Sequence, residues 1–246
     1  MAGSVFTFEK SAAKRLAHCA DRAIPGLQGG KLHEIHAVGN DQAAALAFAL
    51  CRSGKGKAGP ALLARRRRRF QAVLNGDGLA LLGFDPARLT IVDVDCELDL
   101  LRAGLEAARC PGVELVLLET MGRFAGYDLT ASRRLALAAE RSRACVIVLR
   151  QDAEPRSSAA WTRWDIASAP SLPLDADAPG YSAIEARLLR WQGGPAGRRW
   201  RLEWDTDHGT FRDAASLAPI PGALVPLPLV REGKGSGRAG GQPRAA

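Results

Sequence analysis

Short apolar runs alternate with amphipathic stretches over much of the chain, beginning at Leu32. A short apolar run predicts a strand, whereas apolar positions three or four residues apart predict a helix. The pattern predicts strands at residues 32–38, 61–64, 90–94, 113–118 and 145–149. It predicts helices at residues 41–51, 97–109 and 129–143. Strands that alternate with helices are typical of βαβ units, so we predict an α/β fold with a mainly parallel central sheet flanked by helices.

The pattern changes after Arg150. Two β-like segments, residues 184–191 and 198–205, flank a glycine-rich turn. Apolar and charged residues alternate in the second segment, as in a strand with one buried face. We therefore predict a C-terminal antiparallel β-hairpin, extended by residues 210–212.

Three regions follow from these patterns: an N-terminal arm or helix at 1–30, an α/β core with the hairpin at 31–217, and a tail at 218–246. The tail is rich in proline, glycine and basic residues, so we predict a flexible segment. It still carries an apolar run that is a candidate for binding a partner. Its candidate partner-binding residues are Leu224, Val225, Leu227, Leu229 and Val230.

The net charge of +8 over 246 residues is concentrated in two places. The arginine run Arg65–Arg69 contributes +5, and residues 231–246 contribute four basic side chains against one acidic one. Together they account for the whole excess, so the rest of the chain is neutral overall. Such a distribution indicates local anion-binding candidates rather than a general cationic surface.

A strand, loop and helix at the start of a parallel sheet is where a phosphate-binding loop would lie. The loop here, residues 38–42, reads VGNDQ and has neither the lysine nor the Ser or Thr of such a loop. Asp41 also places a carboxylate at the helix N-terminus, which repels phosphate. The sequence SGKGK at 53–57 follows a helix and lacks the upstream glycine. We therefore predict no nucleotide cofactor and no catalytic activity.

The remaining chemical candidates are weak. Glu119 ends an apolar strand, where related ATPases place a magnesium-binding or water-activating acid, but it lacks its lysine and hydroxyl partners. His33 and His36 lie three apart on a strand and so point to opposite faces. The five scattered cysteines form no CxxC pair. These features predict no metal site and a cytoplasmic protein in a reducing compartment, and no apolar stretch is long enough for a membrane span.

Four further stretches of the sequence are distinctive: LHEIHA at 32–37, GFDPARL at 83–89, DLTASRRL at 128–135, and TRW at 162–164 followed by APS at 169–171. Together they resemble the ImuA family of damage-inducible mutagenesis proteins. The third is the most specific, and the similarity extends from about Leu32 to Arg212. The long arginine run Arg65–Arg69 departs from the family's pattern.

The resemblance implies a RecA-like fold, because the family is related to RecA and to the cell-division inhibitor SulA. It also implies a non-catalytic adaptor in SOS-induced translesion synthesis. The implied partners are an ImuB-like Y-family polymerase homologue and an error-prone DnaE-type polymerase, with RecA as a further candidate. Two alternatives stay open. A RecA-like ATP-dependent DNA-binding protein requires a phosphate loop, and a SulA-like inhibitor requires a gene neighbourhood without ImuB and polymerase genes.

Single-stranded or primer-template DNA is a further candidate partner. By family analogy, the segment after strand 145–149, which includes residues 156–164, is irregular and faces DNA. Its arginines would neutralise phosphates and its tryptophans would stack on bases. The candidate DNA-binding residues are Arg65, Arg66, Arg67, Arg68, Arg69, Arg156, Trp161, Arg163 and Trp164. The alternative is that both tryptophans pack beneath the hairpin and the arginine run is a solvated helix face.

Overall fold

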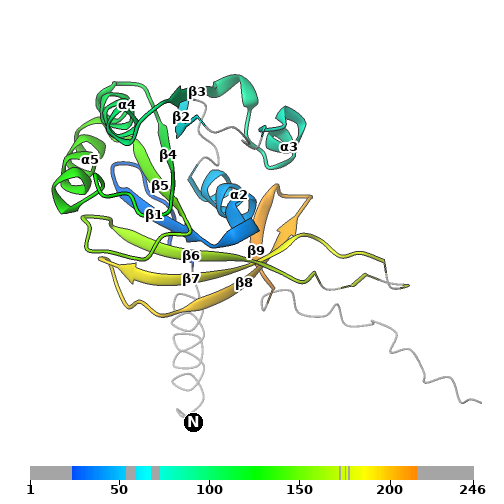
Figure 1. Ribbon diagram of the computed structural model, residues 1–246. Helices are drawn as coiled ribbons and strands as arrows, with labels where there is room; N and C mark the ends of the chain where they lie inside the picture. Colours follow the sequence, from blue (N-terminus) through cyan, green and yellow to red (C-terminus); the bar gives the residue numbers. More distant parts are fainter. Residues whose placement is uncertain are drawn as a thin grey trace, which may run out of the picture.

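A single nine-stranded sheet dominates the computed structural model, which describes residues 24–53, 59–67, 73–171, 173, 174, 176 and 178–214 (Figure 1). The strand order is β3-β2-β4-β5-β1-β6-β7-β8-β9. The strands are β1 (Leu32–Ala37), β2 (Ala61–Arg66), β3 (Leu89–Val94), β4 (Leu115–Met121), β5 (Cys145–Gln151), β6 (Thr162–Ala169), β7 (Ala183–Trp191), β8 (Arg199–Asp205) and β9 (Thr210–Asp213). The helices are η1 (Gly39–Asp41), α2 (Gln42–Ser53), α3 (Gly76–Leu81), η2 (Pro86–Arg88), α4 (Glu97–Arg109) and α5 (Leu129–Ser142).

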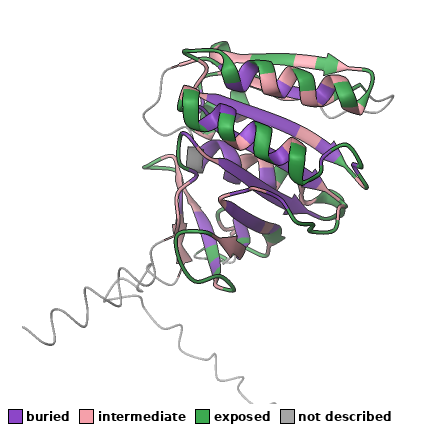
Figure 2. Cartoon of the chain, turned by 90° about the vertical axis from the view of Figure 1, so that its left-hand side faces the viewer, coloured by how far each residue is buried: buried purple, intermediate pink, exposed green. Residues whose placement is uncertain are grey.

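The six strands from β3 to β6 are parallel, which confirms the predicted α/β architecture with a mainly parallel sheet. Helix α2 packs on one face of the sheet, and α4 and α5 cover the other. The central strands β4 and β5 are buried along most of their length, whereas both helices on the second face expose their outer side (Figure 2). Both faces are covered, so the central strands read as continuous apolar runs.

The predicted C-terminal hairpin is present, but it continues the same sheet. Strands β7, β8 and β9 pair antiparallel in succession, and β6 joins β7 to β1. The prediction that residues 156–164 are irregular is wrong at its end, because β6 begins at Thr162. The sequence also gave no sign of the short, glycine-containing helix α3. Within the described part of the chain, no helix is long and apolar enough to span a membrane.

Candidate functional site

Side chains at the end of β5 form hydrogen bonds with the backbone of the loop after β1. Gly39 has a φ of 56°, and its N–H donates to Oδ1 of Asp152 at 2.7 Å. The amide of Gln151 donates to the carbonyl of Gly39 at 2.8 Å. In a phosphate-binding loop, backbone N–H groups of this kind converge on the anion. Here a carboxylate of the β5 end accepts the hydrogen bond that a phosphate would accept.

The first residues after this loop are engaged in the same way. Oδ1 of Asp41 accepts a hydrogen bond from the backbone N–H of Ser168 at 2.9 Å, which ties the start of α2 to β6. The amide of Gln42 donates to Oε1 of Glu119, the acid at the end of β4. Glu119 is thus bound by a neutral amide from α2. The loop links the carboxyl ends of β4, β5 and β6, so its contacts are those of a structural element.

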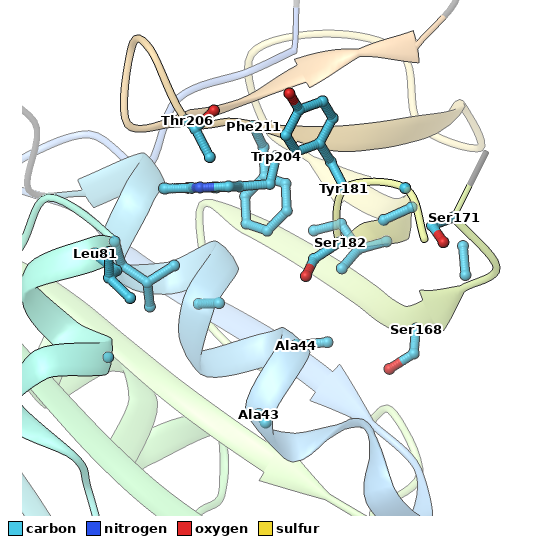
Figure 3. Close-up of a pocket in the computed structure, with 17 residues that line it drawn as sticks. Ala43, Ala44, Leu81, Ser168, Ser171, Tyr181, Ser182, Trp204, Thr206 and Phe211 are labelled. Atoms are coloured by element: carbon cyan, nitrogen blue, oxygen red, sulfur yellow. The ribbon is translucent and has the colours of Figure 1, made fainter. Parts of the chain in front are cut away.

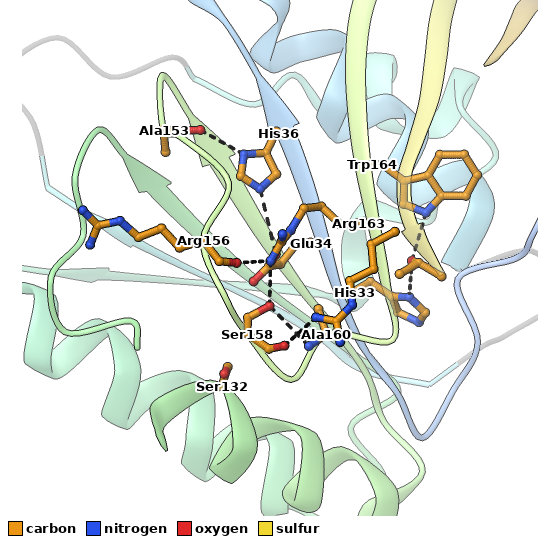
Figure 4. A network of polar contacts seen from close by, with 12 residues as sticks. His33, Glu34, His36, Ser132, Ala153, Arg156, Ser158, Ala160, Arg163 and Trp164 are labelled. Atoms are coloured by element: carbon orange, nitrogen blue, oxygen red, sulfur yellow. Dashed lines mark hydrogen bonds and ion pairs between the residues drawn. The ribbon is translucent and has the colours of Figure 1, made fainter. Parts of the chain in front are cut away.

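A buried ionic network is centred on Glu34 of β1 (Figure 4). The carboxylate of Glu34 is fully buried, and Nε of Arg163 lies 2.5 Å from its Oε2. The hydroxyl of Tyr127 donates to Oε1 at 2.8 Å. Removing two charges from water is costly, and a close pair with additional hydrogen bonds offsets this cost. Both oxygens of Glu34 are therefore satisfied by partners from β6 and from the segment before α5.

The network also holds the connection between β5 and β6, residues 152–161. This connection runs back along β1, since the N–H of Asp152 donates to Ala37 and that of Trp161 to Leu32. The guanidinium of Arg163 donates to Oγ of Ser158 at 2.9 Å and to the carbonyl of Arg156. These bonds fix the connection against the sheet at its middle as well as at its ends.

Three buried groups in and beside this network have shifted pKa values. Burial disfavours the charged form of Glu34, but His36 and the Arg163 charge outweigh it and lower the Glu34 pKa to about 2. Burial raises the pKa of Tyr127 well above 10. On the other face of β1, burial lowers the pKa of His33 to about 4. A general acid or base works best with a pKa near the working pH, which none of these groups has.

An apolar groove of about 770 Å³ opens on the surface of the protein (Figure 3). It lies between the start of α2, the end of α3 and strands β6 to β9. Its lining includes the small residues Ala43, Ala44 and Ala47 and the ring of Phe211. Leu81 also lines it and is 77% exposed. Exposed apolar surface of this kind indicates a docking site.

Comparison with known proteins identifies the family. The chain is 34% identical over 212 residues to Protein ImuA of Caulobacter vibrioides strain NA1000 / CB15N, covering 78% of this chain and 84% of the relative. The match to Protein ImuA of strain ATCC 19089 / CIP 103742 / CB 15 has the same identity and coverage. The chain belongs to the ImuA family. No family model matches the sequence.

In this ImuA-family chain, the described part of the arginine run ends a strand rather than forming a helix face. Nε of Arg65 lies 2.8 Å from Oδ1 of Asp93 on β3. Arg66 lies 3.8 Å from Glu97 at the start of α4. Arg67 is exposed, and Arg68 and Arg69 lie outside the described residues. The first two arginines therefore face carboxylates, which reduces the positive charge that they offer to DNA.

Two of the predicted DNA-binding residues of this ImuA relative are not available for contact. Trp164 is fully buried, with its ring 5.6 Å from that of Trp200 on β8 and 5.2 Å from that of Phe48. Arg163 is buried in the Glu34 pair. The prediction that these two side chains contact DNA is therefore wrong, because a base or phosphate cannot reach them.

Arg156 and Trp161, the other candidates outside the arginine run, keep exposed surface. Arg156 is exposed, and Trp161 is half-buried with Nζ of Lys31 at 4.8 Å from the centre of its ring. The predicted partner-binding run at 223–230 lies outside the described residues, as do most of the predicted N-terminal arm and the SGKGK stretch except Ser53. Sequence patterns missed the groove of the ImuA chain and the Asp152 contact, since both depend on residues more than a hundred positions apart.

Proposed function

We propose that the protein is a non-catalytic adaptor of a damage-inducible mutagenesis complex. Membership of the ImuA family supports this role, because the resemblance links that family to damage-inducible mutagenesis. The proposed partners are an ImuB-like Y-family polymerase homologue and an error-prone DnaE-type polymerase, which together carry out translesion synthesis. RecA is a further candidate partner, and the proposed location is the cytoplasm.

One observation carries the non-catalytic part of this proposal: Asp152 occupies the hydrogen-bonding position of a phosphate at Gly39. A nucleotide would have to break that bond and approach two further carboxylates, Asp41 and Glu119. These carboxylates are negatively charged and would repel a phosphate, although a helix N-terminus by itself attracts one. The proposed RecA-like fold is supported by the parallel strands and by the position of this loop after β1.

The apolar groove and the paired arginines favour an adaptor over a direct DNA-binding role. The groove offers apolar side chains, whereas the two best-placed arginines of the run face Asp93 and Glu97. Binding to DNA depends on phosphate neutralisation by available cations. Binding to a protein partner depends on apolar side chains that lose contact with water, and the groove provides them.

We expect no saturable binding of ATP and no ATP-dependent rise in melting temperature for the full-length chain. The physical reason is the absence of a lysine and a magnesium-binding hydroxyl from residues 38–42, together with the Asp152 contact. Equilibrium binding of labelled ATP with magnesium measures this, and a RecA-type ATPase is the positive control. Saturable binding that weakens in a Gly39→Val variant would place a nucleotide at the loop and would overturn the proposal.

A further inference from the structure

We propose that the groove in Figure 3 binds the protein's own C-terminal apolar segment, residues 223–230. The groove would then be covered from within the chain, and a partner would have to displace this segment to reach it. The inference rests on the groove, on the position where β9 ends, and on charge. It holds whether or not the protein acts in mutagenesis.

The groove requires an apolar ligand. Leu81 is 77% exposed and Tyr181 is 46% exposed, and both line the same hollow as the rings of Trp204 and Phe211. These two rings meet edge to face with centres 5.2 Å apart and form a firm wall. The alanines of α2 leave space in front of it, as Figure 3 shows for Ala43 and Ala44. A ligand that covers these surfaces removes apolar area from water, which is the main driving force for association.

The C-terminal segment begins beside this groove. Strand β9 ends at Asp213, and its Phe211 is itself part of the lining. Ala223 follows nine positions after Ala214, the last described residue, and an extended chain of that length spans roughly 30 Å. The segment can therefore reach any part of the groove. A tether this short gives an effective concentration of about a millimolar, so weak binding is sufficient.

The side chains of residues 223–230 and the charges that follow them are complementary to the groove. Five aliphatic side chains occupy positions 224, 225, 227, 229 and 230, and Pro226 and Pro228 disfavour a helix. We expect an extended ligand, which suits a groove between a helix and strand ends. Basic residues follow at 231, 234 and 238. Exposed carboxylates flank the lining at Asp77, beside Gly78, and at Asp207, beside Thr206.

The test uses the full-length chain with the photoreactive residue benzoylphenylalanine in place of Leu227. After irradiation and trypsin digestion, mass spectrometry identifies the crosslinked peptide. We expect crosslinks within one chain to the tryptic peptides that line the groove, which are residues 32–52, 70–88, 164–187 and 202–212. Gel mobility separates these products from crosslinks between two chains. The same probe at Ala239, beyond the apolar run, is the position control.

A matched pair of variants shows whether the groove itself is responsible. Leu81→Asp places a carboxylate in the groove and should lower the yield by about tenfold or more, because an unpaired charge is costly to bury. Leu137→Asp changes a leucine of similar character, 54% exposed on α5, and should leave the yield unchanged. Circular dichroism verifies that both variants fold. Crosslinks elsewhere, crosslinks only between two chains, an undiminished yield in Leu81→Asp or no crosslink would each overturn the proposal.

Discussion

Replacing Arg163 with methionine is expected to lower the free energy of unfolding by about 3 to 5 kcal/mol. The variant leaves the carboxylate of Glu34, which is fully buried, without its cationic partner. It also removes the donors to Ser158 and to the carbonyl of Arg156 that hold the connection along β1. Urea unfolding at neutral pH, followed by circular dichroism, measures the loss.

An exposed ion pair of the same type provides the control. Arg102 pairs with Asp99 at 3.1 Å on the surface of α4, where the two side chains are 68% and 50% exposed. Arg102→Met should cost less than about 1 kcal/mol, because water already solvates both charges. The double variant Glu34→Leu with Arg163→Met should lose less than the sum of the two single changes. An Arg163→Met chain as stable as Arg102→Met would contradict the assignment of a buried ionic network.

Acid is expected to destabilise the protein through His33, over the range from pH 6.5 to about pH 4. Burial holds the folded-state pKa of His33 near 4, below the ordinary value of 6.5. In this range His33 is protonated in the unfolded chain but neutral in the folded chain, so the free energy of unfolding falls as the pH falls. The full shift corresponds to about 3 kcal/mol, and about 2 kcal/mol is lost by pH 5. Below pH 4.5 the depressed pKa of Glu34 adds a further loss in the same direction.

Urea unfolding at pH 7 and pH 5 tests this expectation with two glutamine variants. His33→Gln removes the buried histidine, so the difference in stability between the two pH values should shrink by about 2 kcal/mol. His208→Gln, in the exposed turn between β8 and β9, is the matched control for replacing a histidine with glutamine. If the difference shrank no more in His33→Gln than in His208→Gln, another group would have to carry the pH dependence.

The parallel strands could be predicted because both faces of the sheet are covered, which gives β4 and β5 their continuous apolar runs. Strand β6 could not be predicted in the same way. It carries Arg163, whose charge is paired with Glu34 129 positions earlier, so no local pattern reveals that it is buried. The alternative that the tryptophans pack beneath the hairpin was correct for Trp164, which contacts Trp200 of β8.

Some features of the candidate site could be predicted from the sequence and others could not. The missing lysine and hydroxyl of the phosphate loop can be read in residues 38–42, because each role needs a particular side chain at a particular position. The contact between Gly39 and Asp152 cannot be read in the sequence. It depends on two residues with positive φ that the sheet brings together. The groove is equally non-local, because its walls come from six elements, α2, α3 and strands β6 to β9, which the fold brings together.

Complex formation with an ImuB-like Y-family polymerase homologue tests the adaptor role most directly. The two full-length proteins are mixed with and without ATP and magnesium, and size-exclusion chromatography follows their co-elution. The account predicts a complex that forms equally well in both conditions, because residues 38–42 lack the lysine and the hydroxyl of a phosphate-binding loop. No co-elution in either condition, or a complex that forms only with ATP, would contradict it.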